Sequence, residues 1–509
     1  MDGPRQRRFS RKGRERRRQS TPLADKLAQP VHNIPVYEVL TQKEIDLIHQ
    51  KSLEVLSDAG IDFYLEEARE ILKEHGARVN GQTVYFDPDM VMDYVAKAPS
   101  EFIQLARNPE NNIRVGGNHM VFAPVYGPPF VYDLEFGRRD ARLEDFQNFV
   151  KLAYLSPYLN HSGGTVVEPT DIPPEIRHLD MLYSHIAFSD KPFMGSVMSS
   201  QNAQDSVKMA EMLFGADQIR ENPALLSLIN ISSPRRLDER MLEALTVYAR
   251  ARQATIITPF ILSGAMSPVS LAGTLIQQNA EALAGITYAQ MVEPGTPVVY
   301  GSFMTSVDLK SGAPVFGSSE SQLAVYAGAQ LARRYNLPFR SGGMFASSKV
   351  SDAQSAYESV MTMLPAIQAR VNFILHAAGW LENGLVAGYE KFVLDCDLLG
   401  QFYRFLKGID FSEDMLAMQS IKEVQPGGHH LGTPFTMQHF TTAFYRSELF
   451  DLNSYEEWAL QGKKTAPERA AIKVKQMLSS YEQPELDEAL DNELQTFINS
   501  RKAEITSAQ

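Results

Sequence analysis

Short apolar runs of strand length alternate with longer amphipathic segments over most of the chain. This alternation is typical of βα units and of a parallel sheet. Eight strands in series favour an α/β fold of the closed (β/α)8 TIM barrel type over an open, doubly wound sheet. The predicted strands are Val121–Tyr126, His161–Val167, Phe193–Val197, Ala224–Asn230, Phe260–Gly264, Val298–Ser302, Phe339–Gly343 and Phe373–Ala377.

Between most of these strands the chain is long enough for a crossover helix. The pattern of apolar positions at helical spacing supports helices in five of the intervals. They are Ala203–Leu213, Met241–Gln253, Leu271–Met291, Ser321–Tyr335 and Ala353–Ala369.

Helical patterns also flank the predicted barrel, which spans residues 119–400. Residues 31–118 are expected to form an N-terminal helical cap, with a short hairpin near Val84–Phe86. Residues 401–509 are expected to form a C-terminal helical extension: helical as far as Met418, then a loop rich in Gly, His and Thr, then polar amphipathic helices to the end. Residues 1–30 are predicted to be a disordered basic arm.

The composition is that of an ordinary globular protein, with 44% hydrophobic and 22% charged residues among 509. Cys396 is the only cysteine, which excludes an intramolecular disulfide and fits a reducing compartment. No apolar run reaches roughly 18 residues, and the N-terminus lacks the apolar segment of a secretory signal. We therefore expect a cytoplasmic protein without a membrane partner.

The formal net charge of −12 conceals a basic stretch from Arg5 to Arg18. This stretch could contact nucleic acid or an acidic partner, or it could be a solvated tail without a partner. A nucleic-acid enzyme usually carries basic residues across its body as well, and this body is acidic. We therefore predict no nucleic-acid partner.

Aromatic and polar residues follow the predicted strands at the ends where barrel enzymes build their active sites. An aromatic wall with one or two carboxylates suits a quaternary ammonium ion, which has no N–H to donate and is held by ring faces. The alternative for each ring is ordinary packing between strand and helix. The candidate substrate-binding residues are Tyr126, Phe130, Glu168, Met344, Phe345 and Trp380.

Two further residues are candidates for a catalytic role. His376 stands in an otherwise apolar strand, where it could contact a substrate carboxylate or orient the reacting group, or be a core histidine bonded to backbone. Glu382 could be the charge partner of a cationic substrate, or a residue favoured at the start of a helix.

The histidines near the C-terminus give little support for a metal site. His429 and His430 are adjacent and point apart on regular backbone, and His439 brings no carboxylate at a ligand spacing. We predict no bound metal. The nucleotide-binding and nucleophile-elbow motifs GxGxxG, GxxxxGK[ST] and GxSxG do not occur either.

Several short stretches together resemble the trimethylamine:corrinoid methyltransferase family, and the resemblance spans nearly the whole chain. The stretch from Phe339 to Glu382 is the most specific part of it. The matching stretches are His178–Tyr183, Ser189–Gly195, Leu337–Gly343, Gly379–Glu382 and Glu390–Val393.

The resemblance implies a barrel whose mouth docks a small corrinoid-binding protein. It implies that the corrinoid (cobalamin) belongs to this partner, that the chain holds no permanent cofactor, and that the chain forms a homo-oligomer. Founding members carry pyrrolysine near the position of Gly343–Lys349, where this chain has ordinary residues. A quaternary amine leaves as a neutral amine without such activation, so the expected substrates are glycine betaine, proline betaine, carnitine or similar compounds.

Three other functions remain open at this point. The chain could be a methyltransferase specific for trimethylamine. It could be a hydrolase or lyase that uses Glu168 and Glu382 as paired carboxylates and needs no corrinoid partner. It could also be a betaine-binding protein without catalytic activity.

Overall fold

The structure is a computed structural model that describes residues 27–507, so the basic stretch Arg5–Arg18 lies outside the described residues. Parallel strands form the main sheet, in the spatial order β9-β11-β12-β15-β16-β6. The predicted α/β class is therefore confirmed. The strands are β6 (Val121–Phe122), β9 (Leu226–Ile231), β11 (Ala254–Ser263), β12 (Val298–Gly301), β15 (Phe339–Gly342) and β16 (Phe373–Leu375).

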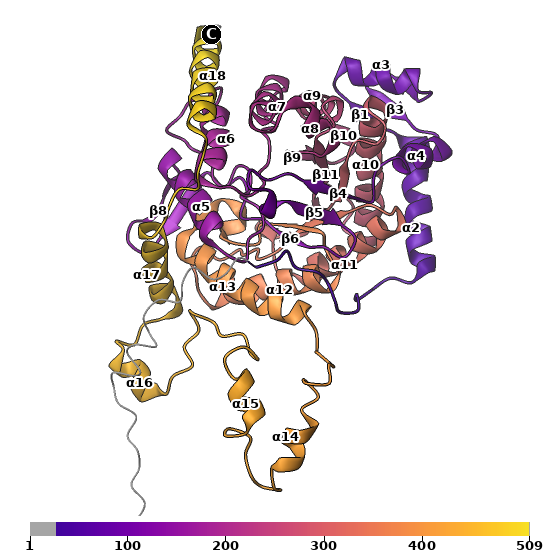
Figure 1. The fold of residues 1–509 in the computed structure, drawn as a ribbon. Helices are drawn as coiled ribbons and strands as arrows, with labels where there is room; N and C mark the ends of the chain where they lie inside the picture. The colour runs from indigo at the N-terminus through magenta and orange to yellow at the C-terminus, as the bar shows by residue number, and fades with distance from the viewer. Residues whose placement is uncertain (1–26, 508–509) are drawn as a thin grey trace, which may run out of the picture.

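Helices surround this sheet, as Figure 1 shows. The five predicted crossover helices are all present within a few residues of their expected bounds. The helices packed around the strands are α5 (Leu143–Leu155), α6 (Arg177–Phe188), α7 (Ser200–Phe214), α8 (Ala216–Glu221), α9 (Glu239–Arg250), α10 (Leu271–Val292), α11 (Ser319–Arg334), α12 (Ala353–Gln368) and α13 (Tyr389–Leu406).

Two of the eight predicted strands are not strands in the structure. His161–Val167 and Phe193–Val197 form no ladder, apart from one parallel bridge between Phe193 and Leu225. Gly163 has a φ of +97°, which interrupts an extended chain. Within residues 27–507 the assigned strands consequently form a sheet that is open between β6 and β9, and not a closed barrel.

Individual hydrogen bonds nevertheless connect the edges of this opening. We call residues 160–165 and 192–194 the linking segments. The N–H of Asn160 donates to the carbonyl of Phe122 over 3.0 Å, so the first linking segment lies beside β6. The N–H of Ser162 donates to the carbonyl of Pro192 (2.8 Å), and the N–H of Met194 donates to the carbonyl of Gly163 (2.9 Å), so the two linking segments are neighbours.

The fifth strand begins earlier than predicted. β11 starts at Ala254, six residues before Phe260, and pairs in register with β9 as far as Pro259 opposite Ile231. Proline has no N–H for a ladder and normally argues against a strand interior. Pro259 therefore hid the first half of this strand in the sequence.

The strands bury apolar side chains on both faces, as parallel strands usually do. On the inner face a separate cluster includes Leu228, Ile256 and Phe373, and it also contains Phe102 and Val115 from an antiparallel hairpin. This hairpin, β4 (Glu101–Gln104) with β5 (Ile113–Gly116), fills the inner face near the amino ends of the strands. Space for a ligand is therefore to be sought at the carboxyl ends.

The N-terminal region is mixed rather than mainly helical. The hairpin predicted near Val84–Phe86 is confirmed, and a third strand pairs with it. Strands of three residues are too short to show an alternating pattern, which is why the others were not predicted. The elements are α2 (Gln42–Glu54), η1 (Val55–Ala59), β1 (Ile61–Phe63), α3 (Glu66–Glu74), β2 (Arg78–Asn80), β3 (Thr83–Tyr85), α4 (Pro88–Val95) and η2 (Pro109–Asn111), with β10 (Arg236–Leu237) beside β1.

A second, smaller sheet lies beyond the carboxyl ends of the main strands. Its order is β17-β18-β7-β8, and it brings residues that follow β6 beside residues that follow β16. A hairpin of β13 and β14 extends the main sheet past β12. These elements are β7 (Phe130–Asp133), β8 (Gly137–Asp140), β13 (Phe303–Val307), β14 (Pro314–Val315), β17 (Trp380–Leu381), η3 (Glu382–Gly384) and β18 (Val386–Gly388).

The C-terminal region is helical but more interrupted than expected. α13 ends at Leu406, and Gly408 has a φ of +70°, so the predicted helix as far as Met418 was wrong. Among the described residues no helix has both the length and the apolar character needed to cross a bilayer. The remaining helices are α14 (Met418–Glu423), α15 (Pro434–His439), α16 (Tyr455–Leu460), α17 (Ala466–Ser479) and α18 (Glu488–Ser507).

His185 on α6 makes the stability of this fold dependent on pH. Its two ring nitrogens contact the hydroxyl of Ser162 and the carbonyl of Gly164, both over 2.7 Å, and burial lowers its pKa to about 4. Between pH 4 and the ordinary pKa of 6.5, the unfolded state therefore binds more protons than the folded state. We expect the free energy of unfolding to fall by about 2 kcal/mol from pH 7 to pH 5 because of this group.

Urea unfolding at both pH values measures this effect in the wild type and in His185→Gln. The variant should lose about 2 kcal/mol of the pH dependence, whereas His429→Gln, at an exposed position, should keep it. An unchanged pH dependence in His185→Gln would contradict the assignment.

Candidate functional site

The candidate site is centred on Arg340, the second residue of β15. Its side chain is 1% exposed, yet no carboxylate of the described residues forms an ion pair with it. Its Nε and Nη1 atoms also have no hydrogen-bond partner among the described residues. Burial lowers the pKa of Arg340 to about 9, so the guanidinium still carries its charge at neutral pH.

His376 lies against this guanidinium and has an unusual backbone conformation. Its φ is +63°, so it leaves the regular course of β16, which ends at Leu375. Its Nε2 is 3.3 Å from Nη2 of Arg340, and its Nδ1 accepts a hydrogen bond of 3.2 Å from the N–H of Tyr126. Burial lowers the pKa of His376 well below its ordinary value, and the charge of Arg340 adds to this effect.

The tautomer of His376 follows from these contacts. A neutral imidazole has one donor and one acceptor nitrogen. Since Nδ1 accepts from Tyr126, Nε2 carries the proton and faces the N–H groups of Arg340. The N–H groups of the two side chains thus face each other at 3.3 Å and do not satisfy one another. An anion bound beside both groups would accept a hydrogen bond from each.

Aromatic rings pack beside this pair of donors. The ring of Trp380 lies 4.4 Å from that of His376 and 4.9 Å from that of Phe345, measured between centroids. Phe303 lies 5.2 Å from Phe345, and the guanidinium carbon of Arg340 lies 5.5 Å from the ring of Phe303. One ligand could therefore place an anionic group against the N–H donors and a cationic group against the neighbouring ring faces.

Four predicted residues belong to this region. Phe345 and Trp380 are part of the aromatic cluster, His376 stands between them and Arg340, and Tyr126 is bonded to His376 through its backbone. The ring of Tyr126 occupies space left free by Gly164, where an added Cβ would lie only 2.8 Å from it.

The other four predicted residues lie at its margin or in other contacts. Met344 is buried and has a φ of +53°, which turns the chain toward Phe345. Phe130 packs under the guanidinium of Arg138, whose Nε donates to Glu382 over 2.8 Å. Glu168 is paired with Arg177 at 3.1 Å. The two glutamates are thus neutralised by separate arginines.

The sequence interpretation missed three residues of the site. Arg340 stands in the stretch Leu337–Gly343, which carried the family resemblance but was not read for its charge. An arginine within an apolar strand was the available signal, because such a residue is almost never fully buried without a partner. Phe303 and Phe316 had no comparable signal, since their role depends on the β13–β14 hairpin.

A buried ion pair on α13 holds the two loops that carry the aromatic wall. Nζ of Lys391 lies 2.5 Å from Oδ1 of Asp395, and both side chains are at most 3% exposed. Nζ also donates to the carbonyl of Met344 over 3.4 Å, and Asp395 accepts from the N–H of Gly379 over 2.9 Å. The pair therefore connects the loop after β15 to the loop after β16.

The C-terminal histidines take part in local contacts. His430 lies 3.2 Å from the hydroxyl of Ser420, and His439 pairs with Asp414 at 3.2 Å. Within residues 27–507 no three histidine, cysteine, aspartate or glutamate side chains gather in a way that could hold a metal ion.

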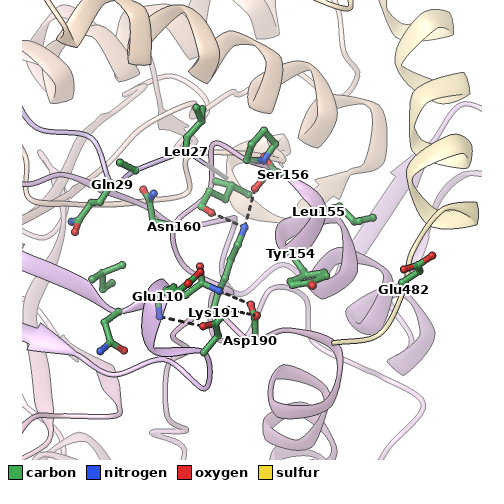
Figure 2. Close-up of a pocket in the computed structure, with 17 residues that line it drawn as sticks. Leu27, Gln29, Glu110, Tyr154, Leu155, Ser156, Asn160, Asp190, Lys191 and Glu482 are labelled. Atoms are coloured by element: carbon green, nitrogen blue, oxygen red, sulfur yellow. Dashed lines mark hydrogen bonds between the residues drawn. The ribbon is translucent and has the colours of Figure 1, made fainter. Parts of the chain in front are cut away.

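Figure 2 shows a cavity, of about 400 Å³, whose lining does not include Arg340. It is lined by Asn160 and Lys191, which come just before or at the start of the linking segments and so belong to the amino ends of the strands. Nζ of Lys191 donates to three backbone carbonyls around the end of α5, at Ala153, Ser156 and Leu159. These contacts give the lysine a structural role, so we do not place the active site here.

The fold and the site together define a class of protein. It is an α/β enzyme with a buried, unpaired arginine beside an aromatic wall. Comparison with known proteins assigns its family. The family model "Trimethylamine methyltransferase (MTTB)" matches residues 7–506, so the chain belongs to this family and is a methyltransferase.

Individual relatives cover almost the full length. The chain is 45% identical to a glycine betaine methyltransferase of Desulfitobacterium hafniense, over 93% of this chain and 98% of the relative. It is 29% identical to a proline betaine:corrinoid methyltransferase of Eubacterium limosum, over 90% of this chain and 96% of the relative. It is 30% identical to a trimethylamine methyltransferase of Methanosarcina barkeri, over 91% of this chain and 94% of the relative.

Among solved structures, the chain is similar to the monomethylamine methyltransferase of Methanosarcina barkeri. The TM-score is 0.50 at 9% sequence identity, over 88% of this chain and 90% of that one. At this identity the similarity concerns the fold alone.

Proposed function

We propose that this enzyme removes a methyl group from a quaternary amine that carries a carboxylate, such as glycine betaine, and transfers it to the reduced corrinoid of a partner protein. The observation that carries the proposal is the buried guanidinium of Arg340, unpaired among the described residues and next to aromatic rings. The similarity to a glycine betaine methyltransferase supports the same substrate.

A betaine matches both walls of the site. Its carboxylate would accept from the guanidinium of Arg340 and from Nε2 of His376, a charge-assisted interaction that suits the planar fork of an arginine. Its methylated nitrogen would then lie toward Phe345 and Trp380, where each ring face contributes about 0.5–2 kcal/mol. Proline betaine and carnitine carry the same two groups, so they remain candidates.

The reaction needs positioning more than acid–base catalysis. The methyl carbon loses its bond to nitrogen, which keeps the electron pair and leaves as a neutral tertiary amine. The same carbon forms its new bond to Co(I) of the corrinoid that the partner presents. The chain contributes a fixed orientation of the methyl group and the exclusion of water.

The alternative functions fit the site less well. Trimethylamine has no carboxylate and would leave Arg340 buried without a counter-ion, which costs several kcal/mol. A hydrolase or lyase based on Glu168 and Glu382 would require the two carboxylates to act together, and each is paired with its own arginine.

We further propose that the chain closes into a (β/α)8 barrel, with the two linking segments as its second and third members. The hydrogen bonds from Asn160, Ser162 and Met194 and the bridge at Phe193 support this arrangement. Arg340 would then point into the barrel near its carboxyl-end mouth, where barrel enzymes bind their substrates.

The corrinoid partner must approach this mouth, and two exposed apolar side chains mark a contact for it. Val269 and Leu309 are each 74% exposed, and both lie within 4 Å of the position of an added Cβ on Gly264. We expect Leu309→Asp to raise KM for the corrinoid protein about 10-fold while kcat at saturating partner stays the same, because a charge on this contact weakens docking. Steady-state kinetics with varied partner concentration measures it; a change in KM for the betaine instead would contradict this placement.

The proposed function is tested with purified enzyme, a reduced corrinoid protein and one methyl donor at a time. Glycine betaine should methylate the corrinoid, which is followed by its absorption spectrum, and trimethylamine should not. Choline, which has the same ammonium group but no carboxylate, is the matched control and should react poorly. Turnover without the corrinoid protein would favour a hydrolase or lyase, and binding of a betaine without methyl transfer to a competent partner would favour a binding protein.

A further inference from the structure

Residues 409–444 form an excursion from the body of the protein, which we call the arm. The chain leaves the body at the end of α13 and returns at Tyr445, and α14 and α15 lie between these points (Figure 1). The arm lies within the described residues, and Ser420 is its single buried residue.

The arm exposes an unusual amount of apolar surface. Ten large apolar side chains in it are exposed by 36% to 82%. Large exposed apolar surface on a protein marks an interaction site when the side chains gather on one face. The ten are Ile409, Phe411, Met415, Leu416, Met418, Ile421, Leu431, Met437, Phe440 and Phe444.

The burial of apolar side chains within the arm cannot account for the stability of its two helices. α14 and α15 have six residues each, and helices this short are not stable on their own. The contacts inside the arm are polar, such as those of His430 with Ser420 and of His439 with Asp414. Within residues 27–507 these contacts leave much of the apolar surface of the arm uncovered, so we look for another molecule that covers it.

The position of the arm indicates which molecule this is. The carbonyl of Leu406, just before the arm, accepts from the N–H of Asn33, and the N–H of the adjacent His32 donates to the carbonyl of Asn118, three residues before β6. Where the arm ends, the hydroxyl of Tyr445 donates to the carbonyl of Asp397 over 2.8 Å. The base of the arm is therefore next to the amino end of β6, whereas the site around Arg340 lies toward the carboxyl ends of the strands.

We propose that the arm packs against a second copy of this chain. The choice of a second copy over the corrinoid protein rests on the proposed function, because that partner must reach the carboxyl-end mouth. Aromatic side chains bury roughly 150–250 Å² each, so the three exposed phenylalanines of the arm supply several hundred Å². The ten side chains together approach the roughly 800 Å² per subunit of a standard interface. Homodimer interfaces are also the most apolar class of protein contact.

Light scattering of the full chain tests the proposal without substrate or corrinoid. The wild type should have a mass of at least twice the chain mass of 56.9 kDa at micromolar concentration. Phe411→Asp combined with Leu431→Asp should shift it to the monomer, whereas Tyr357→Asp, at a position 73% exposed on α12, should not. A monomeric wild type, or a double variant with unchanged mass, would overturn the proposal.

Hydrogen exchange of the wild type provides a second test that needs no variant. Amides of residues 409–444 should exchange faster on dilution to the monomer, while those of β11 and β12 should not change. Equal exchange of the arm at all concentrations would count against a second copy. Protection of the arm only after addition of the corrinoid protein would assign the surface to that partner and would also overturn the proposal.

Discussion

Arg340→Met is expected to reduce kcat/KM for glycine betaine by roughly 30-fold to several thousand-fold, corresponding to about 2–5 kcal/mol. The loss follows from the removal of the only positive charge that the described residues place at the buried end of the site. The substrate carboxylate would then be desolvated without a partner, which costs more than the loss of an exposed ion pair.

This substitution should leave the fold intact. The wild-type guanidinium is buried without a counter-ion, so its replacement by an apolar side chain of similar length is expected to keep or raise the free energy of unfolding. Arg340→Lys should restore little activity, because an ammonium lacks the planar fork that binds a carboxylate through two N–H groups.

Calorimetric titration with glycine betaine and steady-state kinetics measure the effect. Arg138→Met is the matched control, because Arg138 is partly exposed and pairs with Glu382 at the edge of the site. It should change kcat/KM only a few-fold. If Arg340→Met binds glycine betaine within threefold of the wild type, the carboxylate is held elsewhere and the proposed binding mode is wrong.

The sequence predicted the parts of the fold that depend on regular periodicity. Helices such as α10 and strands such as β12 lie close to their expected bounds, because long or clearly bounded apolar patterns determine them. His161–Val167 and Phe193–Val197 were predicted as strands from their length and place in the βα rhythm, but the positive φ of Gly163 interrupts an extended chain in the first of them. Pairing at single hydrogen bonds is a tertiary property that no local pattern reveals.

For the site, position in the strand order was a better guide than residue type. Phe345 and Trp380 were selected because they follow predicted strand ends, and His376 because it is the polar residue near the end of one. The three rings lie together. Glu382 was selected in the same way, but its pairing with Arg138 depends on how the β7–β8 hairpin and the β17–β18 hairpin assemble into the second sheet. Such contacts between loops distant in sequence could not be predicted from one chain.

Lys391→Met is expected to lower the free energy of unfolding by roughly 3–5 kcal/mol. It removes one partner of a buried ion pair and leaves the carboxylate of Asp395 charged or protonated in an apolar environment. It also removes the contact to the carbonyl of Met344, so the loop that carries Phe345 loses its connection to the loop that carries Trp380.

Lys391→Met combined with Asp395→Asn should recover most of this stability, because the amide oxygen of asparagine can still accept from the N–H of Gly379 and no buried charge remains. Urea unfolding of the single and double variants measures the coupling between the two residues. Lys475→Met, which breaks the exposed pair with Glu135, is the control and should cost at most about 1 kcal/mol. If the single variant loses no more than this control, the buried pair does not brace the two loops. If it does lose 3–5 kcal/mol and the double variant is stable but binds glycine betaine weakly, the charged pair is required to hold the aromatic wall in place.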